Sequence, residues 1–212
     1  MLKIILVAVD EQLEAAWRKH CGDLDNVTVE RGSILDVKCD AVVSPANSFG
    51  FMDGGIDMVY SQHFGWHVQE RLQTLIRDRH HGELVVGAAE IVDTGNDAIP
   101  FLIAAPTMRV PMILTDTVSP FLAARAVLLL AKHGRFRSGI LAGEAVAGAV
   151  KSVAFPGLGT GVGRVPPDTC AKQLRAAIDD VLFQNREFPS SWAYASEMHQ
   201  RLYSDRLRNL QM

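Results

Sequence analysis

Short apolar runs alternate along this chain with longer segments in which apolar residues recur at helical spacing. Residues 2–9 form an aliphatic run that only Lys3 interrupts, which is typical of a strand buried on both faces. A short helix is expected at residues 11–20, with Asp10 as its N-cap. Because repeated strand–helix alternation favours parallel strands, the sequence predicts an α/β fold with a mixed, largely parallel sheet.

The alternation continues through most of the chain. Further strands are expected at residues 27–30, 41–43, 84–92, 101–105 and 152–155, and further helices at 56–79, 121–133, 140–150 and 167–184. We expect residues 1–186 to form one domain. Residues 187–212 are expected to form a helical tail packed on that domain, and a partner-binding or dimer helix is the alternative.

Composition excludes several classes of protein. The 212 residues include 48% hydrophobic and 21% charged residues, as in a folded globular protein. The net charge of −3 gives no global positive field, so general nucleic-acid binding is not expected. No apolar run approaches the length of a membrane span, and a cytoplasmic location is expected. The sequence leaves the oligomeric state open.

A glycine-rich loop follows the strand expected at residues 152–155. Residues 156–163 read PGLGTGVG, which places four glycines between a strand and a helix. Glycines let backbone N–H groups converge on an anion, and a helix N-terminus adds favourable partial charge for phosphate. Taken alone, this loop is as compatible with a tight connection as with a phosphate site.

A second polar and glycine-rich stretch, residues 44–57, follows the strand expected at residues 41–43. Asn47 has a donor and an acceptor that can hold two neighbouring hydroxyls, and the carboxylate of Asp57 can orient or deprotonate a water. The alternative is structural, with Asn47 as a turn residue and Asp57 as a first-turn helix residue.

Four sequence blocks resemble the macrodomain family, whose members bind ADP-ribose. Residues 32–47 resemble the family's GDIT…DAIVNAAN stretch, and residues 54–57, Gly-Gly-Ile-Asp, resemble its GGVD. Residues 82–95 resemble its GE…GEA…TGG block, and residues 155–162 resemble its phosphate loop. The blocks follow the family's order over about residues 27–182, which implies a three-layer α/β/α macrodomain-like fold.

The resemblance implies a site for ADP-ribose or an ADP-ribosylated substrate, without a cofactor or a metal. Asn47 would bind the distal ribose, and Asp57 would position a water against the anomeric carbon as the second catalytic residue. The other ligand-binding residues would be Ser33, Ile34, Gly54, Gly55, Ile56, Gly159, Thr160, Gly161, Val162, Gly163 and Arg164. Three functions remain open: an ADP-ribosyl hydrolase, a reader without turnover, and an interaction protein that has lost the ligand.

The chain also departs from the family's pattern. Ser33 stands where the family usually has the Asp that accepts the adenine amino group, and Met52 and Asp53 stand where glycines are usual. The family often has an aromatic residue after the phosphate loop, and this chain has Gly163-Arg164-Val165 there instead. The Arg164 side chain could contact a phosphate or could simply be solvated, and both alternatives stay open. Gly163 occupies the position of an Asp in a related branch with a lysine nucleophile, which argues against that branch. The helix expected at residues 56–76, with Phe64-Gly65, resembles that branch, so the subfamily is open.

A few other residues carry weaker signals. His63 and His67 are four residues apart on an expected helix, but no HExxH pattern accompanies them, so a surface helix face is favoured over a metal site. The scattered cysteines Cys21, Cys39 and Cys170 argue against a disulfide framework. Residues 104–109 are expected to form a rim of the site, with no chemistry assigned to Arg109.

Overall fold

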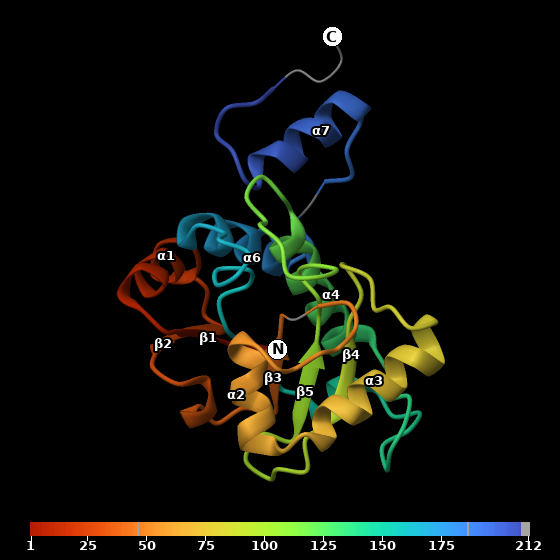
Figure 1. The fold of residues 1–212 in the computed structure, drawn as a ribbon. Helices are drawn as coiled ribbons and strands as arrows, with labels where there is room; N and C mark the ends of the chain where they lie inside the picture. The colour runs from red at the N-terminus through yellow and green to blue at the C-terminus, as the bar shows by residue number, and fades with distance from the viewer. Residues whose placement is uncertain (46, 186, 209–212) are drawn as a thin grey trace.

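A computed structural model describes residues 1–45, 47–185 and 187–208. Within these residues six strands form one sheet in the order β2-β1-β6-β3-β5-β4 (Figure 1). Their neighbours are parallel except for the antiparallel pair β4–β5, which confirms the predicted mixed, largely parallel sheet. The strands are β1 (Lys3–Ala8), β2 (Val27–Arg31), β3 (Ala41–Ser44), β4 (Glu90–Asp93), β5 (Phe101–Ala104) and β6 (Ser152–Phe155).

Helices cover both faces of this sheet and produce three layers. One face carries α1 (Glu11–Cys21), α4 (Ser119–His133) and α6 (Pro167–Val181). The other face carries the 3-10 turn η1 (Ile34–Asp36), α2 (Gly55–Phe64) and α3 (His67–His80). Two shorter elements are α5 (Val146–Ala149) and α7 (Trp192–Arg201). The predicted α/β/α architecture is therefore confirmed.

The strand residues divide between two apolar clusters because successive side chains point to opposite faces of a sheet. In β1, Ile4 and Leu6 belong to the cluster under α1, α4 and α6, whereas Ile5 and Val7 belong to the cluster under α2 and α3. A strand that is buried on both faces needs an apolar run, which is why residues 2–9 indicate such a strand.

The prediction of a single helix at residues 56–79 is wrong, because the chain forms two helices, α2 and α3, with a break between them. Gly65 ends α2 with a φ of 99°, a backbone conformation that residues other than glycine rarely adopt. A Cβ at this position would lie 2.8 Å from Nδ1 of His67. The apolar periodicity runs across the break without indicating it.

Two other expected elements are shorter than predicted. The helix expected at residues 140–150 is reduced to α5, because a bridge between Arg135 and Ala145 closes a loop that contains Gly139 and Gly143 at positive φ. The strand expected at residues 84–92 begins only at Glu90. In both places glycines at positive φ interrupt the apolar pattern.

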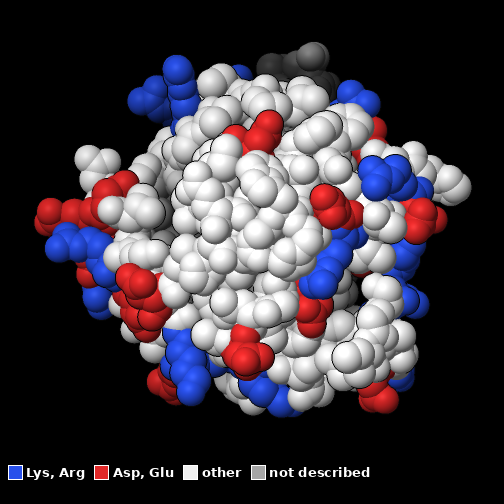
Figure 2. Space-filling view, turned by 60° about the horizontal axis from the view of Figure 1, so that its bottom comes forward, with Lys and Arg blue, Asp and Glu red and all other residues white. Residues whose placement is uncertain are grey.

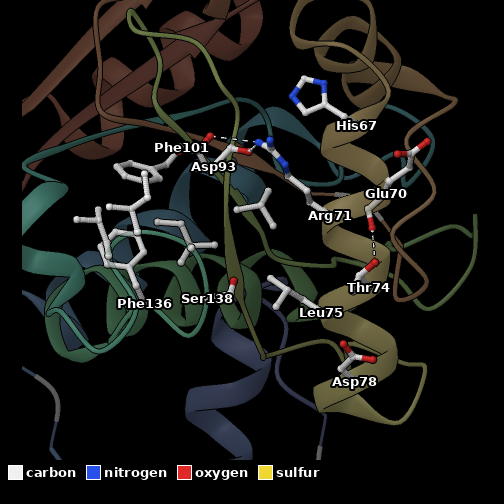
Figure 3. A pocket seen from close by; sticks show the side chains of 15 residues that line it. His67, Glu70, Arg71, Thr74, Leu75, Asp78, Asp93, Phe101, Phe136 and Ser138 are labelled. Atoms are coloured by element: carbon white, nitrogen blue, oxygen red, sulfur yellow. Dashed lines mark hydrogen bonds and ion pairs between the residues drawn. The ribbon is translucent and has the colours of Figure 1, made fainter.

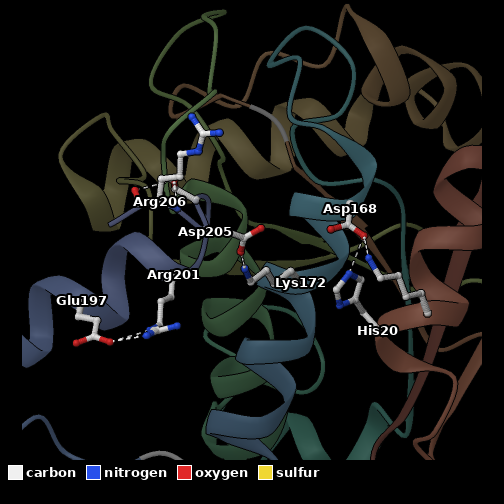
Figure 4. A network of polar contacts seen from close by, with 9 residues as sticks. His20, Asp168, Lys172, Glu197, Arg201, Asp205 and Arg206 are labelled. Atoms are coloured by element: carbon white, nitrogen blue, oxygen red, sulfur yellow. Dashed lines mark hydrogen bonds and ion pairs between the residues drawn. The ribbon is translucent and has the colours of Figure 1, made fainter. Parts of the chain in front are cut away.

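The C-terminal segment contains the expected helix. Ser191 caps α7 by accepting a hydrogen bond from the Tyr194 N–H. Beyond α7, Asp205 forms a 3.0 Å ion pair with Lys172 of α6 (Figure 4). Leu202 packs against the larger apolar cluster, while 73% of the Trp192 side chain is exposed. The division into residues 1–186 and 187–212 stays a prediction.

The three cysteines are all free and buried. Burial raises the pKa of the Cys21, Cys39 and Cys170 thiols to about 12, because a low-dielectric environment disfavours the thiolate. Cys170 is fully buried in α6, as expected for a small hydrophobic residue. In the part of the chain that the structure describes, no helix combines the length and hydrophobicity needed to cross a bilayer.

Candidate functional site

The two glycine-rich loops leave the same edge of the sheet from paired strands. β3 and β6 are parallel neighbours, with Ala41 opposite Val153 and Val42 opposite Ala154. Residues 45–54 follow β3, and residues 156–166 follow β6. Ligands of parallel α/β sheets bind beyond the carboxyl ends of the strands, so this edge is where a site is expected. We call the two loops together the carboxyl-edge site.

The segment at Ser33 follows β2, which lies two strands beyond β6, and it reaches the same edge of the sheet. The Gly32 N–H donates 3.0 Å to the Ala8 carbonyl at the end of β1, and Ser33 then caps η1 through a hydrogen bond from the Leu35 N–H. From β2 to β3 there are three inter-strand steps of about 4.8 Å, or roughly 14 Å in all. An elongated ligand fits such an array. Ile34 is buried in the smaller apolar cluster, where its side chain packs in the core.

Two glycines of the loop after β6 are required by the loop's own packing. Gly159 has a φ of 71°, and a Cβ there would lie 3.0 Å from Val165 Cγ2. A Cβ at Gly163 would lie 2.5 Å from the Gly159 carbonyl oxygen. The Val165 N–H also donates 3.0 Å to that oxygen, which folds the loop into a tight turn. These glycines need no ligand to explain them.

Gly54 and Gly161 are different, because nothing in the described residues requires glycine at either position. Neither has a φ in the left-handed region, and a Cβ at either would meet no atom within 4 Å. Gly54 precedes the first turn of α2, where no side chain of the described residues caps the helix N-terminus. Its first N–H groups are therefore available to an anion. Glycine is a favoured N-cap residue, which is one reason for it at position 54, and close approach of a ligand is a further physical reason for glycine at both positions.

Asn47 lies at the start of the loop after β3, in a bridge with Met108. Its Oδ1 accepts hydrogen bonds from the N–H groups of Phe49 (3.1 Å) and Phe51 (3.2 Å), and its Nδ2 donates 2.8 Å to the Phe51 carbonyl. The amide therefore braces the turn at residues 47–51. The side chain is half-buried at the carboxyl edge, and among the described residues no acceptor is found for its second Nδ2 hydrogen.

Asp57 lies in the first turn of α2 and points into the protein. Only 5% of the residue is exposed, and its Oδ1 accepts a 2.5 Å hydrogen bond from the hydroxyl of Ser44 at the end of β3. Burial raises the pKa of this carboxyl to about 7, and the Ser44 hydrogen bond opposes that rise. The geometry places Asp57 behind Ser44, close to the edge but screened from solvent.

A third loop, residues 105–118 after β5, ties the two glycine loops together. The Thr107 hydroxyl donates 2.9 Å to the Pro45 carbonyl, and the Leu114 N–H donates 2.7 Å to the Gly163 carbonyl. Arg109 pairs through two nitrogens with Glu83 at 2.7 and 3.1 Å, and its guanidinium lies 5.2 Å from the centre of the Phe49 ring. The sequence indicated a rim here but gave no signal for the Arg109–Glu83 pair.

Few charges surround the site. Arg164 has a φ of 53° and an exposed side chain at the end of the loop after β6. Asp168 lies in the first turn of α6, and its carboxylate pairs with Lys19 Nζ (2.6 Å) and His20 Nε2 (2.9 Å) on α1 (Figure 4). The two partners hold the pKa of Asp168 below its ordinary value. Its negative charge is therefore largely compensated where α6 begins.

A groove of about 700 Å³ lies elsewhere, between α3, β4 and the loop that contains Ser138 (Figure 3). Arg71 pairs with Asp93 across it at 3.2 Å. Asp93 is opposite Phe101, the first residue of β5, so this groove lies toward the amino ends of the parallel strands. His67 also lines it, with Nε2 3.0 Å from the Thr94 carbonyl. The described residues contain no cluster of three side chains suited to a metal.

Comparison with known proteins identifies the family. The sequence profile of the Macro domain family matches residues 43–174, which include both glycine loops, so the chain belongs to the macro domain family. It is also 32% identical to an uncharacterized protein of Aquifex aeolicus over 149 residues, covering 70% of this chain and 78% of the relative.

Solved macrodomain structures share the fold. The macrodomain of Mycobacterium tuberculosis DarG is 20% identical, with a TM-score of 0.56 over 70% of this chain and 87% of that one. A Trypanosoma brucei macrodomain in complex with ADP-ribose is 17% identical, with a TM-score of 0.52 over 71% of this chain and 56% of that one. At these identities the likeness concerns the fold alone.

Proposed function

We propose that the carboxyl-edge site binds ADP-ribose, either free or as the ADP-ribosyl group of a modified substrate. The observation that carries the proposal is the pair Gly54 and Gly161, which the described residues leave without a conformational or packing reason. The two glycines lie on loops that follow adjacent strands. If the two loops enclose a diphosphate between them, a side chain at either position would collide with it. Membership of the macro domain family and the ADP-ribose complex of the Trypanosoma brucei macrodomain support the same ligand.

The placement of the ligand follows from the available donors. The first N–H groups of α2 and those of residues 159–163 bind the diphosphate, with Arg164 adding positive charge from the rim. Asn47 donates its second Nδ2 hydrogen to the distal ribose. The Ser33 oxygen already accepts the Leu35 N–H, so its hydroxyl hydrogen is the part left for the base.

The proposed reaction is hydrolysis of the bond between the distal ribose and its acceptor. A water adds to the anomeric carbon, the bond to the acceptor breaks, and the proton lost by the water passes to the leaving acceptor or to solvent. Asp57 orients the water, accepts its proton and passes it on to the leaving acceptor or to solvent, with Asn47 holding the ribose. At its pKa of about 7 the carboxyl is partly ionised at neutral pH, which suits a general base.

The burial of Asp57 favours a second candidate, a reader that binds ADP-ribose without turnover. The carboxylate is 5% exposed and already bonded to Ser44, and the Asn47 amide already makes three hydrogen bonds within its own loop. Water must reach Asp57 past Ser44 for hydrolysis to occur. A reader needs no such movement.

Calorimetric titration with ADP-ribose tests the binding proposal. We expect micromolar affinity, about −8 kcal/mol, for the wild type. Gly54→Val and Gly161→Val should weaken binding by tenfold or more, and Gly161→Val should do so without lowering the melting temperature. Gly148→Val is the matched control, because Gly148 also has open space but lies in α5. Equal affinity in all four proteins would refute the proposed site.

Release of ADP-ribose from a mono-ADP-ribosylated protein separates the two candidates. Hydrolysis by the wild type that is lost in Asp57→Asn and Asn47→Ala would support the hydrolase. Binding without release of ADP-ribose from any substrate would select the reader. Release that persists in both variants would remove the catalytic roles of these residues.

A further inference from the structure

β4 is the last strand at one edge of the sheet, so one side of its backbone has no neighbouring strand. The Thr94 N–H donates 2.9 Å to the Pro100 carbonyl, which continues the antiparallel register of β4 with β5. Opposite residues of an antiparallel pair alternate between hydrogen-bonded and non-hydrogen-bonded positions. Val92 therefore bonds to β5, whereas the backbone groups of Ile91 and Asp93 face the free edge.

A contact from α3 agrees with this alternation and covers one end of the edge. Arg71 Nη1 donates 2.8 Å to the Asp93 carbonyl and lies 3.2 Å from Oδ1 of the same residue, so the charge of its guanidinium is compensated. Among the described residues no hydrogen-bond partner is found for the Ile91 N–H, the Ile91 carbonyl or the Asp93 N–H. Unpaired strand edges of this kind pair readily with another extended chain.

The free edge of β4 lies in the groove of about 700 Å³ between α3 and the loop that contains Ser138, where Ile91, Val92 and Asp93 are lining residues. The two walls belong to opposite faces of the sheet, with α3 on one side and residues 136–141 on the other (Figure 3). A second copy of β4 would lie at the bottom of an equal groove, so the walls keep two copies of the edge apart. A single extended chain is narrow enough to enter.

The two walls differ in chemistry. Glu70 and Asp78 line the α3 wall, are exposed, and have no ion pair within the part of the chain that the structure describes. Phe136 and Leu141 line the loop wall, and the centre of the Phe136 ring lies 5.1 Å from that of Phe101. Successive side chains of a strand point to opposite faces. A chain in which basic side chains alternate with apolar ones would therefore place each kind against the matching wall.

Charge distinguishes this groove from the uncharged surface over α2. Residues 54–69 include no lysine or arginine, and their one carboxylate, Asp57, is buried. Figure 2 brings forward the lower side of the molecule, where α2 lies in Figure 1, and shows a broad central area without charged side chains. The groove, in contrast, is lined by three carboxylates and one guanidinium, that of Arg71. Its excess of negative charge favours a basic ligand.

We propose that this groove binds an extended segment of a partner protein in which lysine or arginine residues alternate with aliphatic or aromatic ones. The segment adds a further strand to the sheet by hydrogen bonding to Ile91 and to the Asp93 N–H. Its basic side chains face Glu70 and Asp78 on α3, and its apolar side chains pack on the loop wall. Strand addition gives affinity through the main chain and specificity through alternate side chains. The proposal is independent of the ligand bound at the carboxyl edge.

Three synthetic peptides with the same side chains test the proposal by fluorescence anisotropy. The first alternates valine and lysine over six residues, and the second places its three valines before its three lysines. The third is the first peptide with every backbone nitrogen methylated, so that it cannot donate to a strand edge. We expect saturable binding of the first peptide and at least tenfold weaker binding of the other two. The proposal is overturned if the first peptide does not bind saturably or if either of the others binds as tightly.

Hydrogen exchange of single amides locates the bound strand. In the free protein the Val92 amide should exchange more slowly than those of Ile91 and Asp93, because only Val92 donates to β5. The alternating peptide should slow exchange at Ile91 and Asp93 by tenfold or more. Slower exchange elsewhere without a change at these two amides would place the peptide on another surface and overturn the proposal.

A charge reversal at each edge of the sheet separates the groove from general electrostatic attraction. Glu70→Lys changes an exposed residue of the groove, and Glu30→Lys changes an exposed residue of β2 at the opposite edge. We expect Glu70→Lys to weaken binding of the alternating peptide at least fivefold and Glu30→Lys to leave it within twofold. Both variants should keep the wild-type melting temperature and the wild-type affinity for ADP-ribose. Equal weakening in both variants would identify non-specific attraction and overturn the proposal.

Discussion

The Ser44 hydroxyl donates a 2.5 Å hydrogen bond to the Asp57 carboxylate, and the two residues are 0% and 5% exposed. The bond joins the end of β3 to the first turn of α2, on either side of the loop that contains Gly54. It also keeps a titratable carboxyl inside the protein, where burial raises its pKa to about 7 from an ordinary 3.8. Stability and proposed chemistry are therefore linked through one group.

The pH dependence of stability should show this carboxyl. Between pH 4 and 7 the unfolded chain ionises Asp57 while the folded protein keeps its proton, so the free energy of unfolding falls as pH rises. The slope from this group is on the order of 1.4 kcal/mol per pH unit, and it ends above the folded pKa. Urea unfolding at pH 4.5, 6 and 8 measures it.

Asp57→Asn should remove that slope, because the amide does not titrate but can still accept the Ser44 hydrogen bond. The variant should gain stability relative to the wild type as pH rises. Asp53→Asn, an exposed residue of the same loop, is the control and should leave the slope unchanged. Parallel pH profiles for wild type and Asp57→Asn would contradict the raised pKa.

Gly159→Ala should destabilise the fold without a ligand being present. The substitution forces an alanine to a φ of 71° and brings its Cβ to 3.0 Å from Val165 and 3.1 Å from Leu114. We expect a loss of about 1–3 kcal/mol in the free energy of unfolding. Gly161→Ala in the same loop should change it by less than about 0.5 kcal/mol. Equal losses of unfolding free energy in the two variants would contradict the structural difference between Gly159 and Gly161.

Arg109→Ala should act on ligand affinity more than on stability. Its pair with Glu83 is exposed, but the guanidinium also lies over Phe49, whose N–H bonds the Asn47 amide. Loosening this turn should reduce ADP-ribose affinity roughly tenfold by calorimetry, with little change in melting temperature. Arg71→Ala breaks the comparable exposed pair with Asp93 and should leave affinity unchanged.

Glu90→Gln should lower stability through a buried charge network. Glu90 is 5% exposed, and its Oε1 lies 3.0 Å from Arg79 and 2.8 Å from His80 at the end of α3. Removing the carboxylate leaves the Arg79 guanidinium without its counter-charge and His80 without its charged hydrogen-bond partner, so we expect a loss of about 2 kcal/mol by urea unfolding. Glu70→Gln, exposed on α3, should have no comparable effect.

The central part of the fold was predictable because its signals are local. The aliphatic run of β1, the Asp10 cap of α1 and the turn residues after β3 and β6 each follow from neighbouring residues. Glycines at positive φ limited the prediction. Gly65 divided one expected helix, and nothing in apolar periodicity separates a glycine that bends the chain from one that does not.

The candidate site was predictable in its position and less so in its contacts. That two glycine loops follow strands was readable, and their adjacency follows from the β3–β6 pairing. The burial of Asp57 and the bracing role of Asn47 depend on how side chains pack, which spacing along the chain does not specify. The Arg109–Glu83 pair joins residues 26 positions apart and left no local pattern.

The buried thiols make the protein suited to single-site labelling. With each native thiol pKa near 12 and each sulfur inside the core, maleimide reagents at neutral pH have little thiolate to attack. One cysteine introduced at an exposed position such as Val162 would then carry a fluorophore in an otherwise unmodified chain. Its emission would report arrival of ligand at the loop directly.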